Sequence, residues 1–490
     1  MPSRSRPEAA DILLISLVVL TGFALRIFRI AEIPFTHDEF SAILRTRYDS
    51  FGDLIRHGVM VDGHPAGVQV FLYMLVKTFG VSEITLKLPF ILFGTAAIVY
   101  LYLVGRDWFN PTAGLVAAAF LAFLQFPVMY SQLARPYASG LLFCLMMTWY
   151  WTRVLFFPEN KYIPNLVAFI LTGALCAYNH HFSLLFAGMA GLTGLLFCRR
   201  KRLGTYLLAC GAVILLYLPH LPVLFAQLKT GGIEGWLAKP RYDFIADFLQ
   251  YAFHFSWLVY GLVILLIILA FTLRPRVYRT ETRMWLVSLS WFLLPLITGF
   301  LYSLLRSAVL QYSVMIFSFP FLLLLVAGLF RTDRNPHKAI LVILVAAVTI
   351  PTLVFGRRHY DIFYHGVYRE IVAEAKKAGD SLGNGNCAVL LDAKKEINPY
   401  YLVKLECRNL RFTYFENVWK EPGFGRYLDS LQTNWLAFGC LASTPQESYP
   451  MILERFPYLV RHTTYHGGEF YLFSRVAGDR TLTEYFDTAV

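Results

Sequence analysis

The stretch FGVSEITLKLPFILFGTAAIVYLYLVGRDWFNPTAGLVAAAF, residues 79–120, contains two apolar runs joined by a short loop that holds Arg106 and Asp107. An α-helix needs about 20 predominantly apolar residues to cross the hydrocarbon core of a bilayer. The first run, 84–104, meets this length, and the second continues beyond the quoted stretch to residue 129. The stretch therefore predicts a helical hairpin that crosses a membrane twice.

The composition of the whole chain agrees with a membrane protein. Of its 490 residues, 57% are apolar and 16% are charged, a ratio that disfavours a water-soluble enzyme. Aromatic residues make up 16% of the chain, which argues against intrinsic disorder, and 7 cysteines are too few for a disulfide-stapled scaffold of this length. A polytopic helical membrane protein remains.

Eleven stretches are long and apolar enough to be read as crossings. The predicted spans are 11–30, 84–104, 111–129, 137–157, 163–179, 182–198, 204–222, 253–273, 284–305, 308–330 and 339–356. Residues 66–79 are also apolar, but a run of this length is more typical of a helix that lies at the membrane surface. We therefore interpret 66–79 as a juxtamembrane helix.

The distribution of basic residues supports this topology. Because cytoplasmic loops are enriched in Lys and Arg, a correct set of spans should collect these residues on one side. The basic loop residues that fall on the side of the N-terminus are Arg4, Arg6, Arg106, Arg199, Arg200, Lys201, Arg202, Arg274, Arg276, Arg279, Arg283, Arg331, Arg334 and Lys338. The net charge of +12 is thus largely explained by topology, and nucleic acid is not an expected partner.

The composition changes after Gly356, where long apolar runs end and charged residues become more frequent. Residues 1–356 are accordingly predicted to form the transmembrane domain and residues 357–490 a soluble α/β domain. The expected strands are 387–392, 434–442, 458–465 and 469–476, and the expected helices are 367–378, 398–406 and 445–456. An odd number of crossings places this domain outside the cytoplasm, where a pair among Cys387, Cys407 and Cys440 could form a disulfide.

The chemistry of the chain has to be sought in its polar loop residues, because no P-loop, dinucleotide fingerprint, HExxH or paired CxxC motif occurs. The first candidate group is Thr36-His37-Asp38-Glu39, just after the first span. Asp38 is interpreted as a general base and Glu39 as its partner, turned toward a metal, a sugar hydroxyl or a structural neighbour. The alternative is that both are merely solvated carboxylates.

Three further groups fall on the same outer side. Asp62-Gly63-His64-Pro65 forms a rigid turn that would hold an imidazole at the interface. In YSQLARPY (130–137), Arg135 either snorkels to lipid headgroups or binds a lipid phosphate with its planar fork. The fourth group is Asn179-His180-His181, joined by Arg306; adjacent histidines diverge on a helix and are weak evidence for a metal. All four groups fall on the same side of the membrane, which is what a shared site at one membrane surface would require.

With these residues in view, the sequence resembles the membrane-embedded GT-C glycosyltransferases, in the branch of the dolichyl-phosphate-mannose protein mannosyltransferases and aminoarabinose transferases. The resemblance covers about residues 11–330. It rests on His-Asp-Glu (37–39), His64-Pro65, the run at 79–120, YSQLARPYA (130–138) and NHHFSLL (179–185).

The resemblance implies a GT-C fold with juxtamembrane helices, a polyprenyl-phosphate-linked sugar donor and a catalytic aspartate, which here is Asp38. It also implies that His64 and Arg135 line the region where donor and acceptor bind. The expected substrate-binding residues are His64, Arg135, Tyr137, His180, His181 and Arg306. Where relatives have Arg-Tyr this chain has Gln311-Tyr312, so Arg306 could replace a lost phosphate contact, and Tyr137 stands where some relatives have an acid.

The sequence thus predicts an inverting glycosyl transfer outside the cytoplasm, in a bacterial plasma (inner) membrane, to an envelope glycan, lipid or protein. The alternatives are a flippase for lipid-linked sugars and a non-catalytic envelope assembly subunit. No internal repeat indicates a transporter. No cofactor is assigned, a divalent metal stays open, and neither the sugar nor the acceptor is identified.

Overall fold

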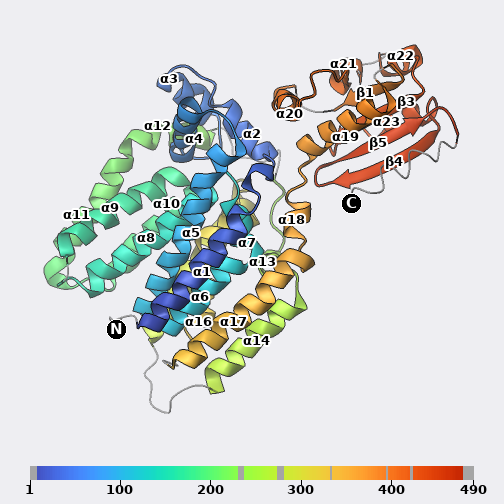
Figure 1. Ribbon diagram of the computed structural model, residues 1–490. Coiled ribbons are helices and arrows are strands. Elements are labelled where there is room, and N and C mark those ends of the chain that lie inside the picture. The colour runs from blue at the N-terminus through green and yellow to red at the C-terminus, as the bar shows by residue number, and fades with distance from the viewer. Residues whose placement is uncertain are drawn as a thin grey trace. The chain divides into compact units, whose positions relative to one another are not determined.

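The computed structural model describes residues 8–159, 161–229, 237–272, 281–330, 334–383, 385–392, 395–419 and 423–477. The chain divides into two compact units, shown as ribbons in Figure 1. The helical unit comprises Met1–Ala31 and Ser41–His359, and the C-terminal unit comprises Tyr360–Val490 together with Glu32–Phe40.

The helical unit consists of helices that follow one another along the chain. They are α1 (Ala9–Ile27), α2 (His37–Leu44, which begins in the C-terminal unit), α3 (Phe51–Asp53), η2 (Leu54–Val59), α4 (Ala66–Phe79), α5 (Glu83–Trp108), α6 (Pro111–Phe123), α7 (Gln125–Ser131), α8 (Pro136–Phe156), α9 (Tyr162–Asn179), α10 (His181–Leu195), η3 (Arg200–Arg202), α11 (Leu203–Tyr217), η4 (Leu218–His220), α12 (Leu221–Lys229), α13 (Phe244–Ala252), α14 (Trp257–Thr272), α15 (Thr282–Leu305), η5 (Tyr312–Phe317), α16 (Phe319–Ala327), α17 (Asn335–Pro351) and η6 (Thr352–Gly356).

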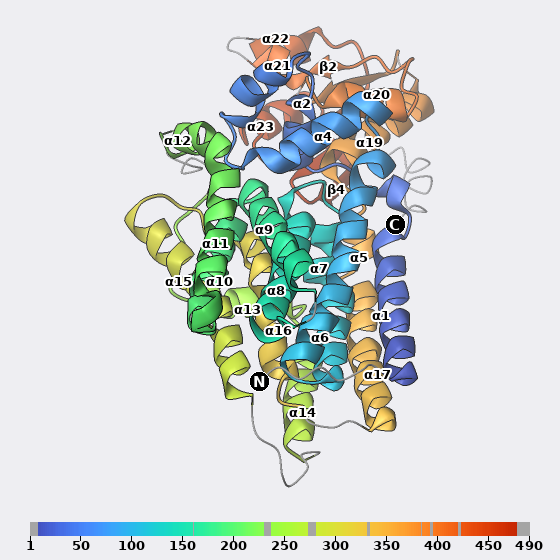
Figure 2. The same cartoon turned by 90° about the vertical axis from the view of Figure 1, so that its left-hand side faces the viewer.

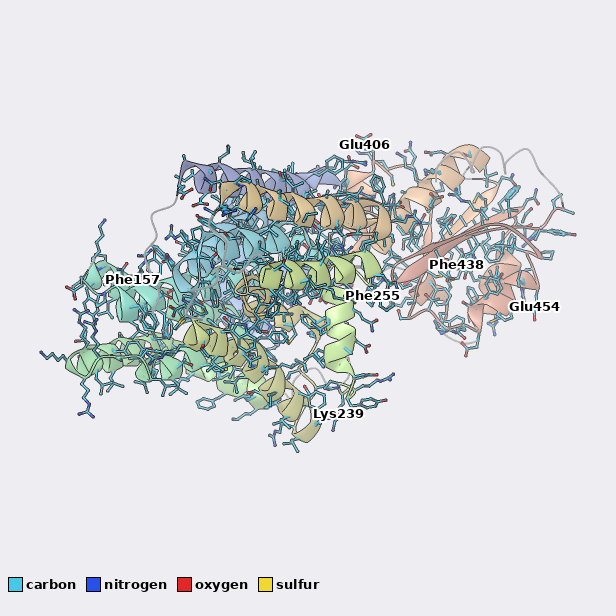
Figure 3. All side chains as sticks on the ribbon, turned by 90° about the horizontal axis from the view of Figure 1, so that it is seen from below. Phe157, Lys239, Phe255, Glu406, Phe438 and Glu454 are labelled. Carbon is cyan, nitrogen blue, oxygen red and sulfur yellow. The ribbon has the colours of Figure 1, made fainter. Side chains whose placement is uncertain are left out.

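The predicted fold class, a polytopic helical membrane protein with a small C-terminal sheet, is confirmed. Within the described residues, six helices are long and apolar enough to cross a membrane, or up to eight if two bent pairs each count as one span. The pairs are α6 with α7, bent by 61°, and α13 with α14, bent by 92° near Phe255 (Figure 3). Every predicted span overlaps at least one helix, although 308–330 is divided between η5 and the short helix α16. The number of eleven crossings stays a prediction.

The hairpin of α5 and α6 lies at the centre of the helical unit, where α5 also packs against α1 and α8 (Figure 2). Every residue of α6 is buried. A Cβ atom added at Gly105 would lie 2.7 Å from the Cα atom of Gly114, so the two backbones approach closely at this point. Asn110 caps α6 by accepting a hydrogen bond from the Ala113 amide, and Pro111 begins the helix.

Buried charges at one end of the unit are paired. Asp107 contacts the guanidinium of Arg106 at 2.8 Å and that of Arg153 at 2.9 Å, which joins α5 to α8. Asp11 and Lys338 contact each other at 2.8 Å and join α1 to α17. Of the basic residues assigned to this side, Arg4, Arg6, Arg274, Arg276, Arg279 and Arg331 lie outside the described residues.

The C-terminal unit contains a five-stranded sheet in the order β2-β1-β3-β5-β4. Its strands are β1 (Cys387–Leu391), β2 (Thr413–Tyr414), β3 (Trp435–Leu441), β4 (Tyr458–Tyr465) and β5 (Gly468–Ser474), and its helices are α18 (His359–Ile362), α19 (Val367–Leu382), α20 (Asn398–Lys404), α21 (Phe415–Trp419), α22 (Gly423–Ser430) and α23 (Ser448–Leu453). β1 pairs in parallel with β2 and β3, and β5 pairs antiparallel with β3 and β4. Phe438 of β3 lies in its hydrophobic core (Figure 3).

The sequence identified most of this unit. All four predicted strands and all three predicted helices are present, with ends shifted by at most a few residues. It missed the two-residue strand β2 and the short helices α18, α21 and α22, which are too brief to show a periodic pattern. Cys387, Cys407 and Cys440 are free and buried in the structure.

Candidate active site

The turn Asp62-Gly63-His64-Pro65 connects η2 to α4 and forms one side of the candidate site. The Asp62 carboxylate accepts a hydrogen bond from the Gly63 amide at 2.8 Å, and Pro65 is the N-cap of α4. A second oxygen of Asp62 lies 2.8 Å from the Arg45 guanidinium, and Nδ1 of His64 lies 3.6 Å from the carboxylate. The turn thus holds a carboxylate and an imidazole in a defined arrangement, as the sequence predicted for the imidazole.

Arg135 lies against this turn, although 71 residues separate it from His64. It is the N-cap of α8, where Pro136 begins the helix, and its side chain is 7% exposed. One terminal nitrogen of the guanidinium lies 3.1 Å from Nδ1 of His64. Its Nε–H is buried and donates no hydrogen bond to the described part of the chain. A buried donor of a charged group without an acceptor is costly, so this nitrogen marks a place for a ligand.

The charges around Arg135 leave a positive excess. Burial alone raises the pKa of the Asp62 carboxyl, but the hydrogen bond to His64 and the charges of His64, Arg135 and Arg45 together lower its pKa well below the ordinary value. Asp62 is therefore ionised at neutral pH. The permanent charges of Arg45 and Arg135 then face the single carboxylate of Asp62, and this excess of positive charge favours an anionic ligand.

His180 and His181 lie beside this cluster but do not form a chelate. The ring of His180 is 5.2 Å from that of His64, and its Nδ1 accepts a hydrogen bond from the Phe182 amide at 3.0 Å. Nε2 of His181 lies 3.2 Å from Oε1 of Gln227, whose amide nitrogen donates to the carbonyl of His64 at 2.7 Å. Among the described residues, no group of three or more His, Cys, Asp and Glu could hold a metal ion.

The other predicted substrate-binding residues differ in their surroundings. Tyr137 is buried, with its ring 4.8 Å from Tyr130 and 6.5 Å from His180, and so it belongs to the same cluster. Arg306 is exposed at the C-cap of α15, and within the described chain no hydrogen bond or ion pair joins it to the cluster. Tyr312 stacks on Tyr251 with a ring separation of 5.1 Å.

Asp38 and Glu39 belong to the C-terminal unit, at the start of α2. Oε2 of Glu39 accepts hydrogen bonds from the amide of Thr36 at 2.8 Å and from its hydroxyl at 3.1 Å, and the Thr36 hydroxyl accepts from the Glu39 amide at 3.3 Å. This reciprocal pattern is a capping box, so Glu39 has a structural partner. Asp38 is exposed, with one carboxylate oxygen 3.8 Å from Nδ1 of His37.

Sequence reasoning missed three features of these sites. The capping role of Glu39 had a local signal, since Thr36 precedes it by three residues in the pattern T-x-x-E. Arg45 and Gln227 had none, because their roles depend on contacts with Asp62 and His64 that only the folded chain creates.

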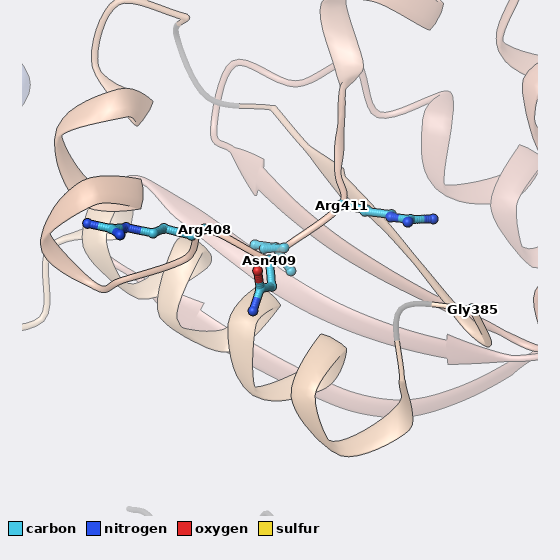
Figure 4. A pocket seen from close by; sticks show the side chains of 5 residues that line it. Gly385, Arg408, Asn409 and Arg411 are labelled. Atoms are coloured by element: carbon cyan, nitrogen blue, oxygen red, sulfur yellow. The ribbon is translucent and has the colours of Figure 1, made fainter.

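A separate pocket of about 550 Å³ lies in the C-terminal unit and does not contribute to the candidate site. Gly385, Arg408, Asn409, Leu410 and Arg411 line it. Figure 4 shows the side chains of Arg408 and Arg411 pointing away from each other. The pocket therefore does not present two guanidinium groups to one anion.

Comparisons with known proteins find a family model and solved structures that are similar to this chain. Residues 63–224 match the family model for dolichyl-phosphate-mannose-protein mannosyltransferase. The matched third of the chain includes His64, Arg135 and the His180-His181 pair, but not Asp38 or Arg306. No curated protein matches the sequence significantly.

Two crystal structures of ArnT from Cupriavidus metallidurans show a similar fold. The apo structure has 10% sequence identity and a TM-score of 0.51, and the structure bound to undecaprenyl phosphate has 11% identity and a TM-score of 0.50. Each comparison covers 95% of this chain and 98% of ArnT. The chain has an ArnT-like GT-C fold. The resemblance to GT-C glycosyltransferases of the ArnT and protein mannosyltransferase type is thereby confirmed, and the comparisons support an enzyme of this class in a membrane.

The partly buried His181 predicts a pH-dependent stability. Burial first, and then the charge of His64, lowers the pKa of His181 from 6.5 to about 4. The unfolded chain therefore takes up a proton before the folded chain does as pH falls, and the stability present above pH 6.5 is lost below it. Between pH 7 and 5.5 we expect a loss of about 1 kcal/mol from this residue.

Thermal unfolding of the detergent-solubilised protein across this pH range measures the effect. The His181→Gln variant should show a shallower decline than the unmodified protein. His57→Gln, at an exposed position of η2, is the matched control and should show the original decline. Equal declines for all three proteins would contradict the assignment.

Proposed function

We propose that this chain is an inverting glycosyltransferase that moves a sugar from a polyprenyl-phosphate-linked donor to an acceptor outside the cytoplasm. The observation that carries the proposal is Arg135, a buried guanidinium whose Nε–H lacks an acceptor among the described residues. It lies in the segment that matches the protein mannosyltransferase model. The ArnT structure with undecaprenyl phosphate supports a lipid of this kind as its partner.

The donor phosphate is assigned to Arg135 on chemical grounds. A guanidinium donates two parallel hydrogen bonds to phosphate oxygens, and such charge-assisted bonds are stronger than neutral ones. Asp62 and Arg45 keep the local charge at an excess of one positive unit. His64 contacts Arg135 and fixes the orientation of its fork. The polyprenyl tail partitions into the bilayer and brings its phosphate to the interface.

The reaction we propose is a single displacement. The Asp38 carboxylate removes the proton of an acceptor hydroxyl, and the oxygen attacks the anomeric carbon of the donor sugar. As the new carbon–oxygen bond forms, the bond from the anomeric carbon to the phosphate oxygen breaks, and its electron pair leaves with polyprenyl phosphate. One displacement inverts the anomeric centre, and Arg135 meets the negative charge of the leaving group.

We place the reaction on the extracytoplasmic side of a bacterial plasma membrane, where nucleotide sugars are absent and a lipid carrier must supply the activated sugar. Arg106 and Lys338 are among the basic residues that the predicted spans place on the side of the N-terminus, opposite the loops of the candidate site, and they support this orientation. The acceptor is an envelope glycan, a lipid or a protein.

Mass spectrometry of the envelope tests this function and identifies the substrates together. Cells that lack the chain should lose one specific sugar from one class of envelope molecule and accumulate that sugar on polyprenyl phosphate. If the chain were a flippase, cells that lack it would instead retain the lipid-linked sugar on the cytoplasmic side of the membrane. A membrane-impermeant periodate treatment of intact cells would then not oxidise this sugar. An unchanged set of envelope glycans, glycolipids and glycoproteins contradicts the proposal.

A further inference from the structure

The segment that contains Asp38 folds with the C-terminal part of the chain. Residues Glu32–Phe40 form one compact unit with Tyr360–Val490, although more than 300 residues separate them in the sequence. This membership is unexpected for a loop that follows the first predicted span. It raises the question of what the C-terminal unit does to Asp38.

Side chains of the C-terminal unit form two hydrogen bonds with the backbone of the segment before Asp38. The Phe35 amide donates to the hydroxyl of Tyr401 at 2.9 Å, and this contact is buried. The carbonyl of Glu32 accepts from the Arg369 guanidinium at 2.6 Å, and another nitrogen of the same guanidinium donates to the carbonyl of Tyr364 at 2.7 Å. The C-terminal unit thus fixes the backbone at two points, three and six residues before Asp38.

Aromatic packing holds the segment on both sides of Asp38. Phe35 and Phe40 are 1% and 3% exposed. The ring of Phe35 lies 5.5 Å from that of Tyr400, and the ring of Phe40 lies 5.9 Å from Tyr368 and 5.7 Å from Tyr401. These edge-on and tilted contacts between buried rings restrain the backbone that joins them.

A close approach of backbone and side chain adds to this restraint. A Cβ atom added at Gly366 would lie 2.7 Å from Cγ of Pro34, so only glycine leaves room for the proline. The capping box of Thr36 and Glu39, which lie on either side of Asp38, fixes the first turn of α2. The carboxylate of Asp38 therefore projects from a backbone that is held throughout.

The ring of Tyr368 connects this scaffold to the carboxylate. It stacks on His37 with a ring separation of 6.4 Å. Burial, followed by the charges of Asp38 and Asp392, raises the pKa of Tyr368 to about 12, so its hydroxyl is protonated at neutral pH. The C-terminal unit thus brings the side chain of Tyr368 within electrostatic range of the Asp38 carboxylate.

From these contacts we infer that the C-terminal unit positions the catalytic base, with Tyr401 and Arg369 as positioning residues that act through the backbone of residues 32–35. The inference rests on the proposed function of Asp38. It assigns to the C-terminal unit a role in the chemical step rather than in donor binding. A base misplaced by about 1 Å can cost a large part of its rate contribution, so loss of a single anchor should be measurable.

The Tyr401→Phe variant tests the inference, because it keeps the packed ring and removes the acceptor of the Phe35 amide. We expect kcat to fall on the order of tenfold, with KM for the lipid donor unchanged, since the residues proposed to bind phosphate belong to the helical unit. Rates of polyprenyl phosphate release are measured at several donor concentrations, with lipid extract and membranes of cells lacking the chain as donor and acceptor sources. Hydrogen exchange of residues 32–40 should accelerate in the same variant.

Further variants separate positioning from folding. Tyr449→Phe alters a tyrosine of the same unit that packs on Tyr471 and Phe473, and it should leave kcat unchanged. Arg369→Lys, which retains a donor for the Glu32 carbonyl, should keep more activity than Arg369→Met. Thermal unfolding identifies any variant that fails to fold. If Tyr401→Phe fails to fold, the inference is tested by comparing kcat of Arg369→Lys with that of Arg369→Met.

The possible outcomes distinguish the inference from the proposed function. Loss of transfer in Asp38→Asn with normal kcat in both Tyr401→Phe and Arg369→Met overturns the inference alone. A rise in KM without a fall in kcat also overturns it. Normal transfer in Asp38→Asn removes Asp38 as the base, and the inference with it, whereas absence of transfer by the unmodified protein removes the proposed function itself.

Discussion

The Asp38→Asn variant is expected to transfer sugar about 10² to 10⁴ times more slowly than the unmodified protein. Asparagine has the same shape as aspartate but cannot accept the proton of the acceptor hydroxyl, so the nucleophile loses its base. The side chain is exposed at the start of α2, and the fold should tolerate the exchange. The measurement is the initial rate of polyprenyl phosphate release under saturating donor.

A matched control distinguishes loss of the base from loss of a surface charge. Asp49 is a fully exposed acid that also lies between α1 and α4, and Asp49→Asn should keep the original rate. Binding of undecaprenyl phosphate should be the same in both variants, because the proposed phosphate contacts lie elsewhere. A near-normal rate in Asp38→Asn would remove this residue from the mechanism.

The second large effect is expected at Arg135. Replacing it with alanine should weaken the binding of undecaprenyl phosphate by about 10²-fold, because charge-assisted hydrogen bonds to an ionised group contribute about 1.5–3 kcal/mol. The buried position of the guanidinium, 7% exposed, limits compensation by water. Native mass spectrometry or fluorescence titration of the purified protein with undecaprenyl phosphate measures the affinity without knowledge of the sugar or acceptor.

Two companion variants make the result specific. Arg135→Lys keeps the charge but loses the planar fork, and it should bind with an affinity between those of the alanine variant and the unmodified protein. Arg56→Ala removes an exposed arginine of η2 and should leave binding unchanged. If Arg135→Ala binds as tightly as Arg56→Ala does, the phosphate is bound at another place.

The helical architecture could be predicted from the sequence because a membrane helix satisfies its backbone hydrogen bonds within one segment. Residues 84–104 and 137–157 were recognised from local hydropathy, and the helices found there begin and end within a few residues of the predicted limits. The interpretation of 66–79 as a short helix followed from the same local length argument. The strands at 387–391 and 458–465 were visible for a comparable reason, since their composition differs from that of the flanking turns.

The parts that sequence reasoning missed depend on contacts between distant residues. The bond between Phe35 and Tyr401 joins residues 366 positions apart, so no local pattern places residues 32–40 in the C-terminal unit. The ion pair of Arg45 with Asp62 also depends on tertiary packing. By contrast, the predicted spans placed His64, Arg135 and His180 on the same side of the membrane, and in the structure His64 contacts both other residues.

The most direct test of the central claim combines purified protein with membranes from cells that lack it, since these membranes supply both the unused donor and the unmodified acceptor. The account predicts that the unmodified protein restores the missing sugar and releases one polyprenyl phosphate for each sugar transferred, whereas Asp38→Asn does neither at a comparable rate. Restoration of the sugar without release of polyprenyl phosphate, or equal release by both proteins, would contradict it.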